Sequence, residues 1–438
     1  MNKIRNHSDE KSALQQLWIA FLTVTIPIVC VGGASFFPYT IRLPLIYMTG
    51  IVFVIMFVFS NIKLYFNSVT IPFALFLICI GISCFNSLDI DTSFNLFLIY
   101  LCAFTLLFID IPQNALSRII TVIYVFAIVI AFSIIISVFI NNCMTKYFWF
   151  IVNPGRSVEV TKAINKELAI GSFSGFAREK AEAAYIVNVG IAVSFSRYFS
   201  KGKLEKKDAF FLLVLLAALI LTGKRTLFII PTVCFAVFIM VAHIKGKLFR
   251  AASVIIIAGI GVIFIMMFVP EMANIFNRFL DQDSMESIGN RDELWKYIFM
   301  MISQYTLFGA GFGSYNEYAY QNGLRVYGAK WTYNAHNAYF QVLGELGVVG
   351  EIIFILFVIS AFIFTIKLIS KVKDDSSASQ IAFFSLYIQI LLLIYAVTGN
   401  PLYTKQIIFM WIFAIGAALQ IKRPSSVRNI KGGAIKYE

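Results

Sequence analysis

Long apolar stretches alternate with short charged segments along most of the chain. A helix needs about twenty predominantly apolar residues to cross the hydrocarbon core of a bilayer. Twelve stretches reach or approach that length without a charge deep in their middle, which predicts an all-α polytopic membrane protein with about 12 transmembrane helices. The predicted spans are 17–37, 43–60, 69–87, 93–109, 119–140, 183–199, 209–223, 226–244, 251–270, 344–366, 380–399 and 406–421.

The polar segments divide the chain into three regions. Residues 1–270 hold the first nine predicted helices and an outer loop at 141–182. Residues 271–343 form a large extracytoplasmic loop in which amphipathic helices are expected. Residues 344–438 hold the last three helices and a basic cytoplasmic tail. Because the long outer loops are the only sizeable polar regions, the loop at 271–343 is the expected catalytic region.

Composition and charge support this organisation. Hydrophobic residues make up 59% of the chain and charged residues only 13%, whereas soluble domains have about 25% charged residues. This excludes a soluble enzyme with a single anchor. With the N-terminus inside, more than half of the 36 lysines and arginines fall in cytoplasmic segments, as the positive-inside rule requires. The net charge of +13 therefore indicates orientation and does not indicate nucleic-acid binding.

Nothing in the sequence calls for a metal or another cofactor. The six cysteines occur singly, without a C-x-x-C pair, and are interpreted as packing residues. The histidine of the large loop has no carboxylate or thiolate company at ligand spacing.

The segment 289–295 of the large loop is typical of a helix start. Asn290 is the expected N-cap and Glu293 occupies the capping-box position. The apolar residues that follow recur at helical spacing, which predicts an amphipathic helix. The glycine-rich segment 309–313 ends that helix and is not a nucleotide loop, because no strand precedes it.

Arg291 would then be the first helical residue. There its guanidinium and the unpaired backbone N–H groups of the helix start would together bind a phosphate. The alternative is an ion pair of Arg291 with Asp292 or Glu286.

His336 is the only one of the three histidines expected on the extracytoplasmic side, because His7 and His243 lie in predicted cytoplasmic segments. Histidine is the side chain that ordinarily changes its charge near neutral pH, so His336 is a candidate for proton transfer. The alternative is a structural histidine that caps a loop. On a continuous helix Glu345 would lie about 180° around the axis from His336, so the two should not pair directly, although Gly344 and Gly347 could break the helix.

Two more cationic sites lie in outer segments. Lys224 and Arg225 are adjacent in a hairpin between two short spans, where they either bind a lipid-linked anion or extend to lipid phosphates for anchoring. Arg178, in the other outer loop, either contacts a phosphate or sugar or pairs with Glu182 one turn later. Aromatic residues of these loops, Trp331 and Tyr339 among them, suit stacking on sugars or an interfacial belt.

The ordered set of these motifs resembles the O-antigen polymerase and ligase superfamily of polytopic membrane glycosyltransferases. The likeness spans roughly residues 170–350 and is carried by Gly223–Thr226, Asn290-Arg291 followed by Trp295, Leu307–Gly311, and His336–Tyr339 leading to Glu345–Gly350.

The resemblance implies a GT-C-like fold in the bacterial inner (plasma) membrane, with the active site facing the periplasm. It implies a metal-independent glycosyltransferase that uses undecaprenyl-diphosphate-linked oligosaccharides and polysaccharides in lipopolysaccharide biosynthesis. The resemblance also implies that the basic residues bind the diphosphate, that Arg225 and Arg291 among them contribute to catalysis, and that the histidine assists the transfer step. The diphosphate-binding candidates are Arg225, Arg291, Lys224 and Arg178, and the glycan-binding candidates are Asn337, Tyr339 and Trp331. His336 is the catalytic histidine, which either removes the proton of the acceptor hydroxyl or orients that hydroxyl.

Within the superfamily the segment 174–179, followed by Ala183-Ala184, is similar to one that many polymerases carry, apart from Lys180. It favours an O-antigen polymerase, with a chain-length regulator as a possible protein partner. An O-antigen ligase that transfers the glycan to lipid A-core is the alternative. A transporter or flippase is a second alternative, but the chain lacks the intramembrane charges that line transport pathways.

Overall fold

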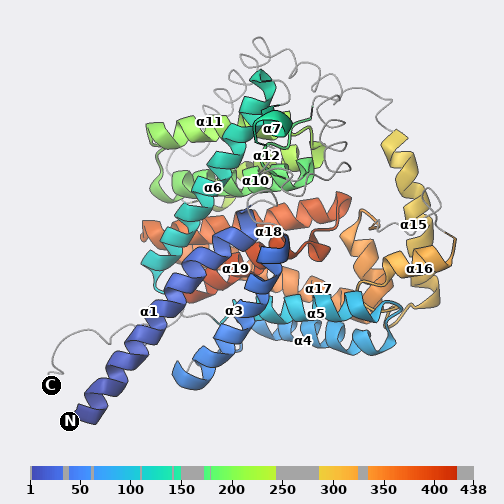
Figure 1. The fold of residues 1–438 in the computed structure, drawn as a ribbon, viewed down its shortest axis with the longest axis horizontal. Helices are drawn as coiled ribbons and strands as arrows, with labels where there is room; N and C mark the ends of the chain where they lie inside the picture. The colour runs from blue at the N-terminus through green and yellow to red at the C-terminus, as the bar shows by residue number, and fades with distance from the viewer. Residues whose placement is uncertain are drawn as a thin grey trace.

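The computed structural model describes residues 2–32, 39–60, 64–108, 111–140, 143–148, 172–177, 179–242, 286–323 and 334–421. Every regular element within these ranges is helical (Figure 1). The helices that fall on predicted spans are α1 (Asn2–Val31), α3 (Tyr39–Ser60), α4 (Thr70–Ser83), α5 (Ile90–Thr105), α6 (Gln113–Phe139), α10 (Lys180–Lys201), α11 (Lys206–Leu221), α12 (Arg225–Val241), α17 (Ala338–Lys371), α18 (Ser376–Thr398) and α19 (Lys405–Ile421). The others are η1 (Cys84–Asn86), α7 (Cys143–Lys146), α15 (Glu286–Gln304), α16 (Tyr315–Gln321) and η3 (Pro401–Tyr403).

The helices coincide with the predicted spans wherever the chain is described. Each predicted span except 251–270 falls on one long helix, and 251–270 lies outside the described residues. Four of the described helices, α3, α6, α17 and α18, are long and apolar enough to cross a bilayer, and several others are apolar but shorter. The chain is therefore membrane-embedded, and its described part is built of helices alone. The count of twelve crossings stays a prediction.

Exposed apolar stripes on the outermost helices show where lipid meets the protein. On α4 the exposed residues are Ile71, Leu75, Ile78 and Ile82, and on α17 they are Ile352, Leu356, Ile359 and Ile363. Their spacing of three or four residues places each set on one helix face. Such apolar faces are stable in contact with hydrocarbon and would be an aggregation hazard in water.

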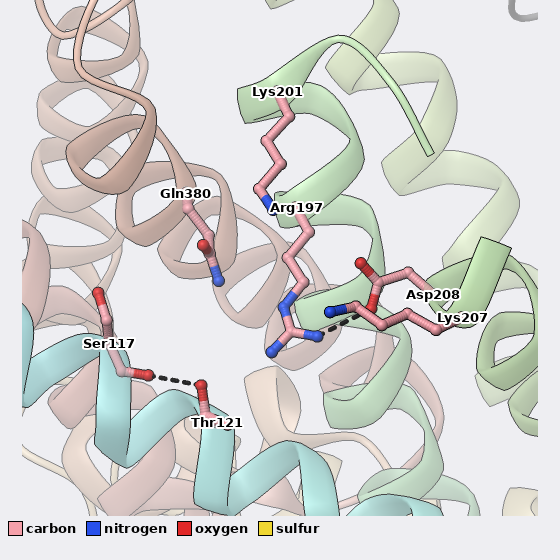
Figure 2. A pocket seen from close by; sticks show the side chains of 7 residues that line it. All are labelled: Ser117, Thr121, Arg197, Lys201, Lys207, Asp208 and Gln380. Atoms are coloured by element: carbon pink, nitrogen blue, oxygen red, sulfur yellow. Dashed lines mark hydrogen bonds and ion pairs between the residues drawn. The ribbon is translucent and has the colours of Figure 1, made fainter. Parts of the chain in front are cut away.

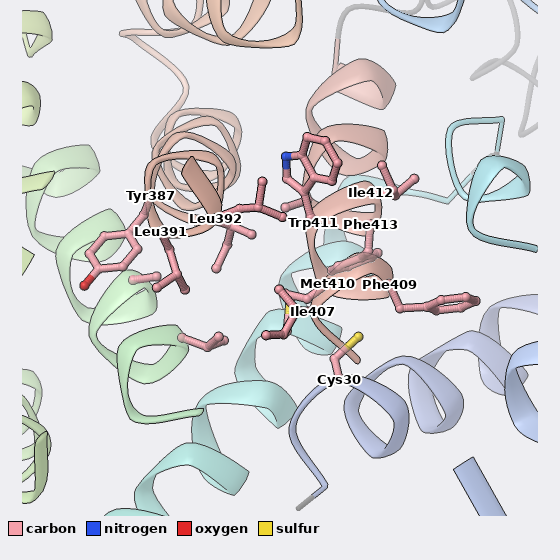
Figure 3. Packing of buried hydrophobic residues seen from close by; sticks show 14 of the residues in the cluster. Cys30, Tyr387, Leu391, Leu392, Ile407, Phe409, Met410, Trp411, Ile412 and Phe413 are labelled. Atoms are coloured by element: carbon pink, nitrogen blue, oxygen red, sulfur yellow. The ribbon is translucent and has the colours of Figure 1, made fainter. Parts of the chain in front are cut away.

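The centre of the bundle is formed by α10, α18 and α19, which are buried along most of their lengths. Trp411 of α19 is almost fully buried, and its ring centroid lies 5.1 Å from that of Phe357. Figure 3 shows Trp411 and its neighbours on α19 packed between α18, which carries Tyr387, and α1, which carries Cys30. A helix apolar on all sides is the sequence pattern expected at such a position.

The bundle has two ends, which we call the loop end and the far end. At the loop end α12 begins and α18 ends, and the hydroxyls of Thr226 and Thr398 are 2.9 Å apart. At the far end α6 and α18 begin, and the hydroxyls of Ser117 and Ser377 are 3.1 Å apart. α15 and α16 lie beside the loop end, on the right in Figure 1, away from the start of α1.

Helix α17 is broken at Gly347, whose φ of 67° and ψ of −173° are not helical. The backbone groups freed by the break bond to the segment that follows α15. Val348 N–H donates to the carbonyl of Thr306 at 2.9 Å, and Gly311 N–H donates to the carbonyl of Glu345 at 2.9 Å. The large loop is thus joined to a membrane helix by backbone hydrogen bonds on both sides of the break.

Gly309 makes this junction possible. Its φ is 71°, and a Cβ at this position would lie 2.1 Å from the backbone carbonyl of Glu345. Only glycine combines the left-handed conformation with so close an approach of two backbones.

We expect Gly309→Ala to lower the thermal midpoint of the purified protein well below that of Gly323→Ala. Both glycines have positive φ, but a Cβ added at Gly323 would meet no other described residue within 4 Å. Both variants therefore incur backbone strain of about 1–2 kcal/mol, while only Gly309→Ala adds a steric overlap that costs about 1–3 kcal/mol more. Equal midpoints in detergent would show that the loop does not depend on this junction.

Candidate active site

His336 lies in a short segment at the loop end, immediately before α17. Its φ is 54°, and it is the only non-glycine residue with positive φ in the described part of the chain. Such a conformation costs about 1–3 kcal/mol and persists only where the surroundings impose it, most often at functional sites. His336 is therefore held in place by its neighbours.

Asn337 provides one of these constraints. As the N-cap of α17, its Oδ1 accepts the backbone N–H groups of Tyr339 at 3.1 Å and Phe340 at 3.2 Å. This accounts for its side-chain oxygen and leaves the amide NH₂ without a partner among the described residues. That group is what Asn337 would offer to a glycan.

α15 provides a second constraint. The indole Nε1 of Trp295 donates to the carbonyl of Ala335 at 3.0 Å, and its ring meets Phe340 edge-on at 5.6 Å. Arg291 precedes Trp295 by four residues, which is one turn of the same helix. The structure thus brings the helix that carries Arg291 against the segment that carries His336. The side chain of Arg291 lies outside the described part of the structure.

The expected start of α15 is wrong. The helix begins at Glu286, so Asn290 lies inside it and is not its N-cap, and Arg291 lies in the second turn. Gly289 does not interrupt the helix, and Glu286 contributes an acidic side chain that favours a helix start. Arg291 consequently has no unpaired helix-start N–H groups beside it of the kind that the capping pattern predicts.

Arg225 occupies the position that was expected for Arg291. It is the first residue of α12, with Lys224 as the N-cap, and the cap residue makes no side-chain hydrogen bond to the helix start. Backbone N–H groups and the helix dipole favour an anion at such a terminus. Both cationic residues are half-buried.

The hairpin of Arg225 and the segment of His336 meet through the end of α18. Thr226 bonds to Thr398, and two residues further along the chain Asn400 donates through Nδ2 to Oε1 of Gln341. Gln341 Oε1 also accepts the backbone N–H of Ala335, next to His336, at 3.2 Å. The Oδ1 atom of Asn400 is buried and has no partner among the described residues.

Residues 172–177 pack under the same hairpin. Phe173 N–H donates to the carbonyl of Leu221 at 3.0 Å, and Phe176 N–H donates to the hydroxyl of Ser133 on α6 at 3.0 Å. Phe173, directly before the segment that resembles polymerases, thus contacts the end of α11 at the basic hairpin, while Phe176 within that segment contacts α6. Arg178 lies outside the described residues, and Glu182, its expected alternative partner, forms a buried ion pair with Arg42 at 3.2 Å.

Of the two aromatic candidates for glycan binding, Trp331 and Tyr339, the structure describes only Tyr339. Trp331 lies outside the described residues. Tyr339 points into the bundle, where its hydroxyl donates to the carbonyl of Leu393 at 3.0 Å and its ring lies 6.3 Å from Phe354. This gives Tyr339 a structural role, and its contact with glycan stays a prediction.

Glu345 lies at the centre of a hydrogen-bond network at the loop end, and sequence reasoning assigned it no role. It is completely buried. Its carboxylate accepts the backbone N–H groups of Gly313 at 2.7 Å and Tyr315 at 3.0 Å, and the Nε2 of Gln341 at 3.0 Å. The hydroxyl of Tyr403 donates to the same carboxylate oxygen as Gly313.

The electrostatics of Tyr403 agree with its role as a donor. Burial and then the neighbouring Glu345 carboxyl raise the pKa of the Tyr403 hydroxyl well above its usual value, so it stays protonated. Its ring stacks on Phe312 with centroids 5.0 Å apart. The signal that could have revealed this network is the pair Gln341 and Glu345, two polar residues one turn apart in an otherwise apolar helix.

Comparison with known proteins finds a related family. The family model described as O-Antigen ligase matches residues 210–355. This match supports the resemblance of the chain to the O-antigen polymerase and ligase superfamily. The members of this superfamily are enzymes of the glycosyltransferase type that act on lipid-linked glycans in the membrane. The matched segment contains the basic hairpin, Arg291, His336 and Glu345. No curated protein matches the chain significantly.

We expect Glu345→Gln to lower the free energy of unfolding by about 1–3 kcal/mol. Four donors face the two oxygens of the Glu345 carboxylate. An amide NH₂ in place of one oxygen cannot accept, so at least one buried N–H would lose its partner. The matched control is Glu351→Gln on the same helix, where one buried oxygen has no partner among the described residues and the change should be nearly neutral. The measurement is the thermal midpoint of each purified variant in detergent. A neutral effect at 345 would contradict the network.

Proposed function

We propose that this protein is an O-antigen or surface-polysaccharide polymerase that joins undecaprenyl-diphosphate-linked repeat units at the outer face of the bacterial plasma membrane. One observation carries the proposal: within a domain of this superfamily, the basic hairpin of Arg225 and the strained segment of His336 are linked to the same residues at the end of α18. Such a site suits transfer between a diphosphate-linked donor and a hydroxyl acceptor.

The loop end faces the periplasm in this proposal. The far end carries Lys201 at the end of α10, Lys203 in the connection, and Lys206 and Lys207 at the start of α11. Such a basic connection favours the cytoplasmic side. No nucleotide is needed at the outer face, because cleavage of the diphosphate ester drives the reaction.

Arg225, Lys224 and Arg291 neutralise the diphosphate in the proposed mechanism. Negative charge grows on the diphosphate as its bond to the anomeric carbon breaks, and fixed cations stabilise that charge more than they stabilise the ground state. Arg225 has the additional advantage of the helix start of α12. Three cations and a helix dipole replace a metal ion, so transfer proceeds without one.

His336 acts as the general base. It takes the proton from the acceptor hydroxyl as that oxygen attacks the anomeric carbon, and the diphosphate leaves on the opposite side with inversion of configuration. A positioned imidazole contributes typically 10²–10⁴-fold to such a step. The constraints from Asn337 and Trp295 hold the backbone of this segment in one conformation.

An O-antigen ligase is the second candidate, and the description of the matching family favours it. A ligase would transfer the completed glycan from undecaprenyl diphosphate to lipid A-core with the same donor chemistry. The polymerase is preferred because the segment 174–179 is similar to one that many polymerases carry. Phe173, directly before it, bonds to the end of α11 beside the hairpin that is proposed to bind the donor. A chain-length regulator is the protein partner that a polymerase would need.

Arg225→Ala and Arg291→Ala should each abolish turnover at normal protein levels, because the leaving diphosphate loses a cation. Arg→Lys should restore little activity, since a lysine does not form the bidentate contact of a guanidinium. The assay offers a lipid-diphosphate glycan to the purified enzyme and measures the released lipid diphosphate, which a transporter would not produce. Arg118→Ala, an arginine at the far end, is the matched control. Full activity of both alanine variants would refute the diphosphate clamp.

His336→Gln should reduce turnover by roughly 10²–10⁴-fold while donor affinity is retained. Wild-type turnover should fall as the pH decreases through the titration of an imidazole, because only the neutral ring accepts a proton. Donor affinity and turnover are measured separately in nanodiscs across this range. A variant with wild-type turnover and an unchanged pH profile would end the assignment of His336 as base, and a loss confined to donor affinity would make it a phosphate contact.

A gene deletion distinguishes polymerase from ligase. Without a polymerase, cells should still attach single repeat units to their acceptor, because the ligation step is intact. Without a ligase, cells should show bare acceptor and accumulate lipid-linked polymer. Gel analysis of the surface glycan reads out the difference, and the second pattern would assign the chain as a ligase.

A further inference from the structure

A cavity of about 240 Å³ opens at the far end, between α6, α10, α11 and α18 (Figure 2). It is lined by Ser117, Thr121, Arg197, Lys201, Lys207, Asp208 and Gln380. α10 is 22 residues long, and at 1.5 Å per residue it separates this cavity from the loop end by roughly 30 Å. The cavity is therefore distinct from the candidate active site.

Arg197 forms the inner wall of the cavity. Its side chain is 17% exposed, one Nη atom donates to Asp208 at 2.9 Å, and the guanidinium lies 4.6 Å from the ring centroid of Tyr124. A guanidinium carries five N–H donors, and the ion pair with Asp208 is its only side-chain hydrogen bond among the described residues. The aromatic ring and Asp208 thus fix the group while most of its donors stay available.

Lys201 and Lys207 add two charges at the mouth of the cavity. Both pair with Glu205, at 2.7 Å and 3.2 Å, but Glu205 is not part of the lining. Hydrogen bonds from the two lysines lower the pKa of Glu205 to about 2. With Glu205 and Asp208 counted against the three cations, the group keeps a net positive charge.

The backbone adds to this positive potential. Ser117, Lys207 and Gln380 lie in the first two turns of α6, α11 and α18, so three helix starts converge on the cavity. Neither α6 nor α11 has a side-chain cap. The side-chain amide of Gln380 has no partner among the described residues and points toward the cavity in Figure 2. Helix starts and unpaired N–H donors both favour an anion.

We propose that this cavity binds a phosphate group, as the headgroup of an anionic lipid or as a free phosphate ion. Its volume equals about eight waters at 30 Å³ each, which is enough for a phosphate and its ester oxygens. Arg197 supplies fixed donors, and Lys201 and Lys207 close over the anion from the mouth. Basic pockets between membrane helices bind phospholipid headgroups in this way. The proposal does not depend on the transferase function.

The test compares two double variants of the full-length protein. Lys201→Gln with Lys207→Gln removes the two lysines of the cavity. Lys203→Gln with Lys206→Gln removes the same charge from the same loop at exposed positions that do not line the cavity. All four positions are at the surface or partly exposed, so both proteins should fold. Native mass spectrometry then measures retention of phosphatidylglycerol against phosphatidylcholine, and inorganic phosphate is titrated as a competitor.

We expect the wild-type protein to retain phosphatidylglycerol selectively. The double variant Lys201→Gln with Lys207→Gln should bind this lipid about 25-fold more weakly, at about fivefold per lysine. The control variant, Lys203→Gln with Lys206→Gln, should bind it less than about twofold more weakly, because its lysines do not line the cavity. Binding of inorganic phosphate with the same variant pattern, but not of the lipid, would identify the free ion as the source. Equal losses in both pairs, or no binding of either ligand by wild type, would overturn the proposal.

Discussion

The loop end depends on one buried carboxylate. Glu345 is fully buried, where an unpaired charge has a high cost in solvation free energy. The folded chain offsets this cost with four hydrogen-bond donors from three separate parts of the sequence. Gly313 and Tyr315 belong to the large loop, Gln341 to α17, and Tyr403 to the turn before α19. Each of these segments is positioned by the same group, so the polar loop acquires a defined location on an apolar bundle without a large hydrophobic interface of its own.

The basic hairpin and the histidine segment are also positioned by hydrogen bonds from polar side chains. Side chains near the end of α18, Thr398 and Asn400, bond to Thr226 on one side and Gln341 on the other. Thr398 and Asn400 lie beyond residue 355, outside the matched family segment. The family segment therefore carries the candidate chemistry, and the last helices supply the polar groups that align it. The far end is built differently, from ion pairs in a short basic loop around a cavity.

The sequence predicted the helices better than the site. Apolar length and charge spacing were sufficient to locate the long helices, because bilayer thickness leaves few alternatives. They were insufficient for α15, where Asn290 and Glu293 mimic a cap inside a helix that starts at Glu286. A capping pattern reports a local preference, and here it falls inside a helix because the residues on both sides of it are helical as well. The partners of Glu345 were not predictable either, because Gly313, Tyr315 and Tyr403 are all distant from it in sequence.

The break in α17 has a mechanical consequence. Before Gly347 the carbonyls of Gly344 and Glu345 accept N–H groups of the loop, and after it the N–H groups of Val348 and Val349 donate to carbonyls of the loop. In an unbroken helix these four groups would bond to one another, because each N–H donates to the carbonyl four residues earlier. Residues 306–311 therefore act as a splint across the break. A position that would otherwise be a hinge is fixed from both sides, so the loop and the two parts of the helix form one rigid unit.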